Sequence, residues 1–289
     1  MNYDVTHVTR YKYGATVELT NGVLRLIPIT GAGQTLERFA LITDPPCLAP
    51  IEHVDAFGNR VASLRVEKAH RELSITAVSR VRVERAALPE HSPAWEHVAE
   101  EALTVDSLAP DCPAIALYPS RRISMFNQAT AYARESFIDR RQVLEAAKEL
   151  SRRMRDDFAY DPEATEVTTP PQEVFENRRG VCQDFAHVMI AALRGLALPA
   201  LYVSGYIRTV PPPGKERLAG ADASHAWVSL WCGSAIGWRD FDPTNAIPVR
   251  NDHIVVARGR DYSDASPIES MVLSSGSHHL QVHVDVIPV

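Results

Sequence analysis

The amino-acid sequence predicts an α+β fold in which an antiparallel β-sandwich is followed by helices packed on an antiparallel sheet. Residues 1–85 alternate between two faces with a period of two, which is typical of strands. Helical spacing of apolar residues is found only after residue 120, and strand-like segments return from residue 200. The chain has 289 residues, which is long enough for two regions, each with a sizeable core.

The composition is that of a soluble globular protein, with 45% hydrophobic and 23% charged residues. The net charge of −6 argues against nucleic acid or an anionic membrane as the main partner. No apolar run approaches the roughly 18 residues of a membrane span, and the segment MNYDVTHVTRYKY lacks an apolar signal core. We therefore expect a cytoplasmic protein that is neither exported nor bound to a membrane.

The four cysteines, Cys47, Cys112, Cys182 and Cys232, are far apart in the sequence and form no CxxC pair or Cys/His cluster. Because such pairs and clusters are the usual signs of a disulfide framework or a structural zinc site, we expect neither, and no cofactor. The sequence also contains no acidic calcium-binding loop pattern. The oligomeric state is left open by the sequence.

Strand pairs account for the first part of the chain. The residues at odd positions from Tyr3 to Tyr13 share one face, and a second period-two run extends from Leu73 to Val83. Turn signals such as TNG at 20–22 and DAFGN at 55–59 lie between the two runs, and no amphipathic helix interrupts them. This pattern predicts an antiparallel sandwich.

A proline-rich stretch, residues 86–120, follows the predicted strands, and its composition is typical of a connector on the protein surface. The sequence thus divides into a β-rich region with its connector, residues 1–120, and a second region, residues 121–289. We expect the second region to include the C-terminal strand.

Two helices are expected before residue 180. Asp139 is the expected N-cap of a helix whose apolar face runs from Val143 to Met154. Thr169 and Gln172 match a capping box, so a second, short helix should begin there and end near Arg179-Gly180.

A third helix should begin just after Gly180, with Phe185, Val188, Met189, Ala192 and Leu196 on one face and Gly195 as its C-terminal stop. Three strands are expected to follow, at residues 200–207, 225–231 and 237–241. The last two are joined by a tight connection, residues 232–236.

Cys182 lies in the first turn of the third helix, where unpaired backbone N–H groups favour an anion and therefore the nucleophilic thiolate. The helix dipole contributes only about 1 kcal/mol. A histidinium at roughly 4 Å would contribute about 4 kcal/mol at an effective dielectric constant of 20. Activation of the thiol therefore requires a nearby histidine.

His225 is the best candidate, because it opens a strand beside a long polar loop, whereas His187 points away from Cys182 on the same helix. If Cys232 pairs with Gly237, the numbers of opposed residues sum to 469. His225 then faces Thr244, and Asp242 lies diagonally beside it, while Asp240 is two positions further away. Cys182, His225 and Asp242 would supply a nucleophile, its base and a residue that orients the imidazole.

Each residue also has a structural interpretation. A cysteine beside an apolar run is usually a small core residue, and a histidine at a strand edge is often only hydrogen-bonded. An aspartate before a proline usually forms a turn. Asp184 is expected to stabilise the first helical turn and to point away from the sulfur. From the residues alone these alternatives stay open.

The segments RRGVCQDFAHVMIAALRGLALPALYVSGY, GADASHAWVSLW and WRDFDPTN resemble, in order and spacing, three signature segments of the bacterial transglutaminase-like superfamily. The segments VTHVTRYKYGATVELTNGVLRLIP and VDAFGNRV resemble the β-rich domain that precedes the core in many bacterial members. The resemblance also extends to NDHIVVARGRDYSDASPIESM and LQVHVDVIPV near the C-terminus. It implies a papain-like α+β core with a Cys-His-Asp triad.

Carried onto this chain, the resemblance makes Cys182 the nucleophile, His225 the general base and Asp242 its orienting residue. The backbone N–H of Cys182 is the expected first donor to an oxyanion, and a side chain, Tyr160 or Tyr206, is the candidate for the second. Gly205 should let the backbone pass close to a neighbour. Loop 209–224 is a candidate lid.

The expected reaction is acyl transfer, in which the Cys182 thiolate attacks a carboxamide or peptide carbonyl of a peptide or protein substrate. Resolution of the thioester by water would make the protein a cysteine protease or amidase, which is our first choice. Resolution by a lysine amine would make it a protein-glutamine gamma-glutamyltransferase. A third alternative is a non-catalytic protein-interaction module on the same fold.

Overall fold

The computed structural model describes residues 1–107, 109–209, 223–272 and 276–289. Its first region is a sandwich of two antiparallel four-stranded sheets, ordered β15-β1-β6-β3 and β14-β2-β5-β4. The strands of the sandwich are β1 (Asn2–Val17), β2 (Thr20–Leu24), β3 (Gln34–Asp44), β4 (Glu52–Val54), β5 (Arg60–Val66), β6 (His70–Val83), β14 (Ile268–Val272) and β15 (His278–Pro288).

The second region contains a five-stranded antiparallel sheet, ordered β12-β11-β10-β9-β13, and the helices. Its strands are β7 (Ala159–Tyr160), β8 (Arg179–Gly180), β9 (Ala200–Ile207), β10 (Ala223–Trp231), β11 (Trp238–Asp242), β12 (Ile247–Pro248) and β13 (His253–Gly259). Its helices are α1 (Trp95–Ala102), a 3-10 turn (Pro113–Ala116), α2 (Asn127–Arg134), α3 (Val143–Asp157), α4 (Pro171–Asn177), α5 (Cys182–Gly195) and α6 (Tyr262–Ala265). The predicted α+β fold is confirmed.

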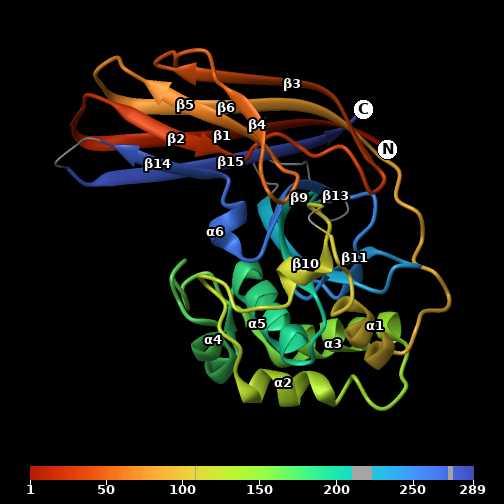
Figure 1. Ribbon diagram of the computed structural model, residues 1–289. Helices are drawn as coiled ribbons and strands as arrows, with labels where there is room; N and C mark the ends of the chain where they lie inside the picture. The colour runs from red at the N-terminus through yellow and green to blue at the C-terminus, as the bar shows by residue number, and fades with distance from the viewer. Residues whose placement is uncertain (108, 210–222, 273–275) are drawn as a thin grey trace, which may run out of the picture.

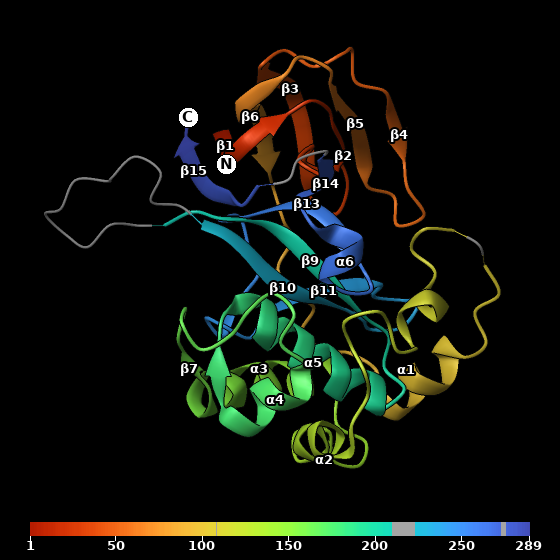
Figure 2. The ribbon, with the colours of Figure 1, turned by 90° about the vertical axis from the view of Figure 1, so that its left-hand side faces the viewer.

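The elements are stacked in layers, with the sandwich at one end, the five-stranded sheet in the middle and helices α2 to α5 at the other end (Figure 1). The view turned by 90° shows the same order (Figure 2). The central sheet is therefore covered by helices on one side and by the sandwich on the other. A site at the edge of this sheet can have walls from both regions.

The division of the chain differs from our expectation at two places. β15 pairs with β1 along its whole length, from Tyr3 opposite Pro288 to Tyr13 opposite His278, and β14 pairs with β2. The C-terminal strands thus belong to the sandwich and not to the second region. The stretch 86–120 is not only a surface connector, since Trp95 on α1 is buried in the main core of the second region.

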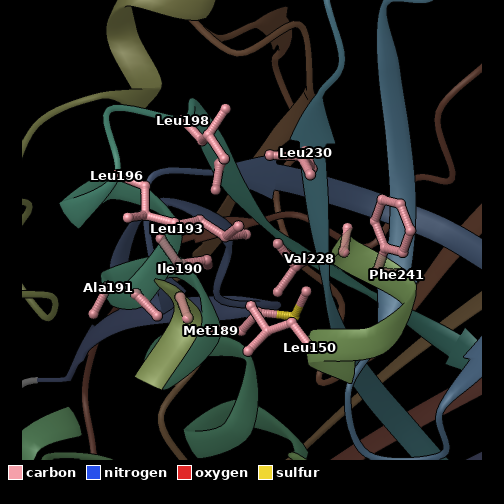
Figure 3. Packing of buried hydrophobic residues seen from close by; sticks show 14 of the residues in the cluster. Leu150, Met189, Ile190, Ala191, Leu193, Leu196, Leu198, Val228, Leu230 and Phe241 are labelled. Atoms are coloured by element: carbon pink, nitrogen blue, oxygen red, sulfur yellow. The ribbon is translucent and has the colours of Figure 1, made fainter. Parts of the chain in front are cut away.

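Helix α5 lies at the centre of that core and is buried on every side from Asp184 to Arg194, not on one face as expected (Figure 3). A helix that is apolar all round is typical of such a central position. It does end at Gly195, but for a different reason from the one predicted. A Cβ at Gly195 would lie 1.9 Å from the Oγ1 of Thr130, so the glycine allows α2 to approach, while Ala197 takes the left-handed conformation.

Two predicted helix caps are wrong. Helix α3 begins at Val143, and the N–H of Leu144 donates to the Oγ of Ser92 at 3.2 Å, so the cap comes from the connector and not from Asp139. Helix α4 follows Pro170, and Thr169 instead accepts a hydrogen bond from the N–H of Glu166. Local spacing could not reveal a cap that is 52 residues away.

The sandwich is held against the central sheet through the edge strand β13. The side-chain amide of Gln34 donates to the carbonyl of Val255 and accepts from its N–H, both at 2.8 Å. Asn59 makes the same pair of hydrogen bonds with Arg258, both at 2.7 Å. Two amide side chains thus replace a neighbouring strand at this edge and fix the relative position of the two regions.

The face of β1 formed by odd-numbered residues changes its surroundings along the strand. Tyr3 and Val5 pack with Tyr206 and other residues of β9 and β13, between the two regions. Tyr13 and Val17 pack inside the sandwich. The polar residues between them, His7 and Thr9, face the cavity described below. The change from apolar to polar and back to apolar residues therefore marks the place where the two regions part.

Candidate active site

Cys182 is the first residue of α5 and is partly exposed. Asp184 accepts a hydrogen bond from the N–H of Val181 at 2.8 Å, which confirms that it stabilises the first turn. A Cβ at Gly180 would lie 2.6 Å from the Asp184 carboxylate, so the glycine permits this close turn. As the first helical residue, Cys182 has a backbone N–H without an acceptor inside the helix.

The hairpin of β10 and β11 has the predicted register. Trp231 pairs with Trp238 and Val228 with Phe241, so the numbers of opposed residues sum to 469. His225 and Asp242 are therefore diagonal neighbours, and His225 Nε2 lies 2.9 Å from Asp242 Oδ2. Asp240 belongs to a separate group, in which it accepts a hydrogen bond from the indole N–H of Trp227.

Asp242 is fully buried, and its two carboxylate oxygens have different partners. Its Oδ1 accepts the backbone N–H groups of Thr244 and Asn245 at 3.0 and 3.1 Å, which makes it a turn former. Its Oδ2 faces His225 and also accepts from the side-chain amide of Asn245 at 2.8 Å. These donors fix the orientation of the carboxylate toward the imidazole.

Cys182 and His225 line the same cavity, and Cys182 is among the groups that raise the pKa of the His225 imidazole. Because Nε2 of His225 is bonded to Asp242, Nδ1 is the nitrogen that remains for the thiol. Burial opposes the charge on the imidazole, but the hydrogen bonds and charges of Asp242 and Cys182 outweigh burial and raise the pKa of His225 to about 10. The ring is thus held as an imidazolium beside the sulfur.

A second histidine, His253 of β13, approaches the same carboxylate. Its Nε2 lies 3.3 Å from Asp242 Oδ2, it is buried, and its Nδ1 has no partner among the described residues. Burial raises the pKa of Asp242, but the hydrogen bonds from His225, His253 and Asn245 and the charge of His225 together hold it well below its ordinary value. The sequence analysis missed His253, whose only signal was its place before the apolar run IVVA.

His225, Asp242 and His253 each offer one atom that could bind a metal ion, all within 4.8 Å of one another. Asp242 already accepts hydrogen bonds on both oxygens, including from two backbone N–H groups. The close approach of the three side chains is therefore explained by hydrogen bonding.

Cys182 and His225 line a cavity of about 420 Å³ between the two regions. The sandwich contributes His7, Thr9 and Leu280 to the opposite wall. Other lining residues include Tyr160, Gln183, Tyr202, Ser204, Tyr262, Ile268 and Val282. The size is within the range of small-ligand pockets.

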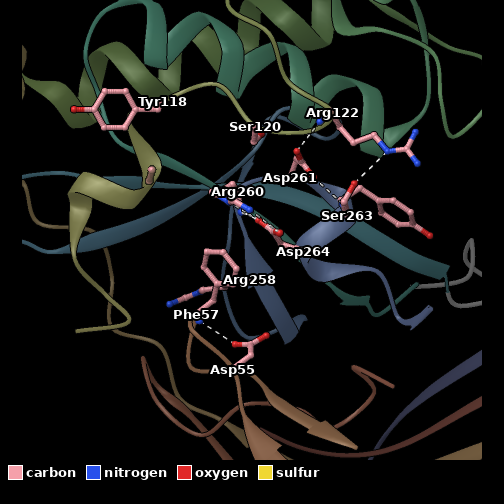
Figure 4. A network of polar contacts seen from close by, with 12 residues as sticks. Asp55, Phe57, Tyr118, Ser120, Arg122, Arg258, Arg260, Asp261, Ser263 and Asp264 are labelled. Carbon is pink, nitrogen blue, oxygen red and sulfur yellow. Dashed lines mark hydrogen bonds and ion pairs between the residues drawn. The ribbon is translucent and has the colours of Figure 1, made fainter. Parts of the chain in front are cut away.

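Helix α6, which brings Tyr262 to this cavity, is held by a network of polar contacts (Figure 4). Asp261 accepts the N–H groups of Arg122 and Ser263 at 2.7 Å each. The N–H of Tyr262 donates to Nε2 of His187 at 3.1 Å, which explains the buried histidine of α5 as a structural residue.

The two tyrosine candidates have different positions. Tyr160 of β7 is exposed, lines the cavity, and pairs with Gly180, two residues before Cys182. Tyr206 is buried between the regions, and its hydroxyl lies 3.0 Å from His7 Nδ1, so it does not line the cavity with Cys182. Tyr202 of the same strand does line it, and the sequence analysis missed this residue although it lies on the same strand face as Tyr206.

Gly205 has the close approach that we expected, since a Cβ there would lie 2.1 Å from the carbonyl of Ile254. A second cavity of about 480 Å³ also touches Tyr160 and His225, and Arg155 and Arg208 line it. Most of the candidate lid, loop 209–224, lies outside the described residues. Among the described parts of the chain, no helix is long and apolar enough to cross a membrane.

Two family models match the chain. The "Bacterial transglutaminase-like N-terminal region" matches residues 3–82, which form most of the sandwich. The "Transglutaminase-like superfamily" model matches residues 130–243, which contain Cys182, His225 and Asp242.

Related proteins match this chain over nearly its whole length. An uncharacterised protein of Mycobacterium tuberculosis is 37% identical over 99% of this chain and 92% of its own length. Another from Mycobacterium leprae is 30% identical over 98% of this chain and 97% of its own length. A protein-glutamine gamma-glutamyltransferase of Pseudomonas aeruginosa is 36% identical over 33% of this chain, but over only 14% of that protein.

The crystal structure of a proposed cysteine protease from Cytophaga hutchinsonii is similar over 100% of this chain and 91% of that one, with a TM-score of 0.74 and 21% identity. This likeness shows that the two chains share a fold, sandwich included. Together, the matched family models, the full-length relatives and the shared fold show that this chain belongs to the transglutaminase-like superfamily, with the N-terminal region found in bacterial members.

Proposed function

We propose that the protein is a thiol-dependent acyl-transfer enzyme that hydrolyses peptide or carboxamide bonds. Membership of the transglutaminase-like superfamily supports the general chemistry. The single observation that carries the proposal is the arrangement of a partly exposed Cys182 beside His225, which is paired with the buried Asp242 at 2.9 Å. This arrangement supports the assignment of Cys182 as the nucleophile, His225 as its base and Asp242 as the residue that orients the base.

In the first step, the Cys182 sulfur forms a bond to the carbonyl carbon, and the C–N bond breaks as His225 gives its proton to the leaving amine. The product is a thioester on Cys182. In the second step, water adds to the thioester as His225 takes its proton, and the C–S bond breaks to release the acid. The N–H of Cys182 is the first oxyanion donor in this scheme, and Tyr160 is the candidate for the second.

The acceptor of the acyl group distinguishes hydrolysis from cross-linking. The second cavity, which shares His225 and Tyr160 with the first, offers space for a leaving group or an acceptor. The described residues that line it include Arg155 and Arg208 but no carboxylate. A protonated lysine would therefore approach like charges there, and water is the favoured acceptor.

Acyl transfer to an amine is the second candidate function. It is supported by the second cavity, which has space for a second substrate. A non-catalytic module is less favoured, because it requires neither an open cleft at Cys182 nor an imidazole beside it.

The test is to incubate the protein with glutamine-containing peptides and a labelled primary amine, and to identify products by mass. We expect free acids or cleaved peptides to exceed amine conjugates, and Cys182→Ala to form neither. Cys47→Ser is the matched control, because Cys47 is also partly exposed but lies in the sandwich. Dominant conjugates would identify a transferase, and equal product from wild type and Cys182→Ala would overturn the proposal.

A further inference from the structure

The wall that the sandwich places opposite Cys182 is built from three residue pairs on neighbouring strands. Val284 lies opposite His7, Val282 opposite Thr9, and Leu280 opposite Tyr11. Val284 is buried between the regions, whereas Val282 and Leu280 are 45% and 47% exposed and line the cavity. Each of these two apolar side chains therefore has exposed surface and takes part in the cavity lining.

The polar groups of this wall are used within the protein. His7 Nδ1 lies 3.0 Å from the hydroxyl of Tyr206, and His7 Nε2 lies 2.9 Å from the Oγ1 of Thr9. These groups have partners already, so the wall offers a substrate apolar contact more than hydrogen bonds.

The part of the cavity lining that the structure describes carries little fixed charge. Apart from the Cys182–His225 pair, the described lining residues include no carboxylate, ammonium or guanidinium group. None of the described residues brings a carboxylate to His7, and burial lowers the pKa of His7 to about 4, so it is neutral near pH 7. A charged substrate side chain in this cavity would lose water without gaining a counter-ion.

From this geometry we infer that the sandwich is part of the active site and that Leu280 and Val282 select acyl donors with an uncharged, apolar or aromatic side chain next to the reacting carbonyl. This inference rests on the proposed function, because it assigns substrate preference to the cavity that contains Cys182. Apolar contact with the two side chains stabilises the bound donor in proportion to the area removed from water. Tyr11, Tyr202 and Tyr262 add aromatic rings to the lining of the same cavity.

The test uses chloromethyl ketones of N-acetylated phenylalanine, lysine and glutamate, with the rate of Cys182 alkylation normalised to that of iodoacetamide. For wild type we expect the phenylalanine reagent to react about tenfold faster than either charged reagent. In Leu280→Asp this preference should be lost, and the lysine reagent should alkylate Cys182 about tenfold faster than it does in wild type. In Leu280→Gln the phenylalanine reagent should alkylate Cys182 more slowly than in wild type, whereas the rate with the lysine reagent should not rise.

Ile287→Asp is the matched control, because Ile287 lies on the same strand with the same 47% exposure but on its opposite face. It should leave all ratios unchanged. Thermal unfolding of each variant distinguishes a local effect from loss of the fold.

Two failures are distinguishable. If iodoacetamide labels Cys182 rapidly but the side chain of the reagent makes no difference, or Ile287→Asp acts like Leu280→Asp, the inference is wrong and the proposed function stands. If iodoacetamide does not label Cys182 in wild type, the proposed function itself fails, and the inference fails with it.

Discussion

Two buried histidines line the same cavity from opposite walls, and they are in opposite charge states. His225 of the second region is 8% exposed and His7 of the sandwich is 2% exposed, so solvent does not explain the difference. His225 contacts the carboxylate of Asp242, and its pKa is raised to about 10. Among the described residues, the hydrogen-bond partners of His7 are two hydroxyl groups, and its pKa is lowered to about 4.

The comparison teaches that the partner, not burial, decides whether a histidine at this cavity is charged. One wall therefore carries an imidazolium next to a thiol, which suits acyl transfer. The other wall stays neutral and can pack against an uncharged substrate.

The largest effect is expected when His225 is made to resemble His7. Asp242→Asn removes the carboxylate that favours the imidazolium, so the pKa of His225 should fall. Activity should decrease by about a thousandfold, as expected when an orienting carboxylate is lost. Activity assays and an NMR titration of the His225 ring check this, and retention of more than a tenth of the activity would contradict it.

A smaller effect concerns stability in acid. The pKa of His7 is lower in the folded than in the unfolded protein. Its contribution to the free energy of unfolding is therefore present above pH 6.5 and is lost as the pH falls toward 4. The loss between pH 7 and pH 5 should be about 2 kcal/mol for this group. His225 acts in the opposite direction, since its contribution is present below about pH 6.5 and is lost as the pH rises through 10.

Urea unfolding of His7→Gln at both pH values measures the acid effect, since glutamine is neutral and can bond to the same hydroxyl groups. On acidification, we expect the free energy of unfolding of this variant to fall by about 2 kcal/mol less than that of wild type. His97→Gln, at an exposed position of α1, should behave like wild type. An equal loss in wild type and His7→Gln would show that His7 is not held neutral.

The smallest effect is expected from His253, a positioning residue that acts through Asp242. His253→Leu removes the donor at 3.3 Å from the carboxylate and should lower kcat/KM about tenfold. The acidic limb of the pH profile should move to higher pH, because this hydrogen bond helps to hold the pKa of Asp242 down. His253→Gln keeps a donor and should restore most of the activity, whereas a purely structural role would not move the limb.

Much of the site followed from the sequence because its key distance depends on local pairing. The tight connection after Cys232 fixes the register of one hairpin, and a strand period of two then puts Asp242 beside His225. The start of α5 at Cys182 also followed from the apolar pattern after Gly180.

The parts that the sequence did not reveal depend on contacts between distant segments. His253 reaches Asp242 because β13 pairs with β9, and Tyr206 turns to His7 because β1 packs on β9. The C-terminal strands return to the sandwich across more than 240 residues. No local pattern specifies such pairings, which depend on the packing of the whole chain.

The most direct test of the account is the rate of iodoacetamide labelling of each cysteine at about pH 6, read by peptide mass, in wild type and Asp242→Asn. We expect that in wild type Cys182 is labelled far faster than Cys47, which is also partly exposed, and that Asp242→Asn slows the labelling of Cys182 alone. Labelling of Cys182 no faster than Cys47, or unchanged by Asp242→Asn, would contradict an imidazolium-activated nucleophile at this site.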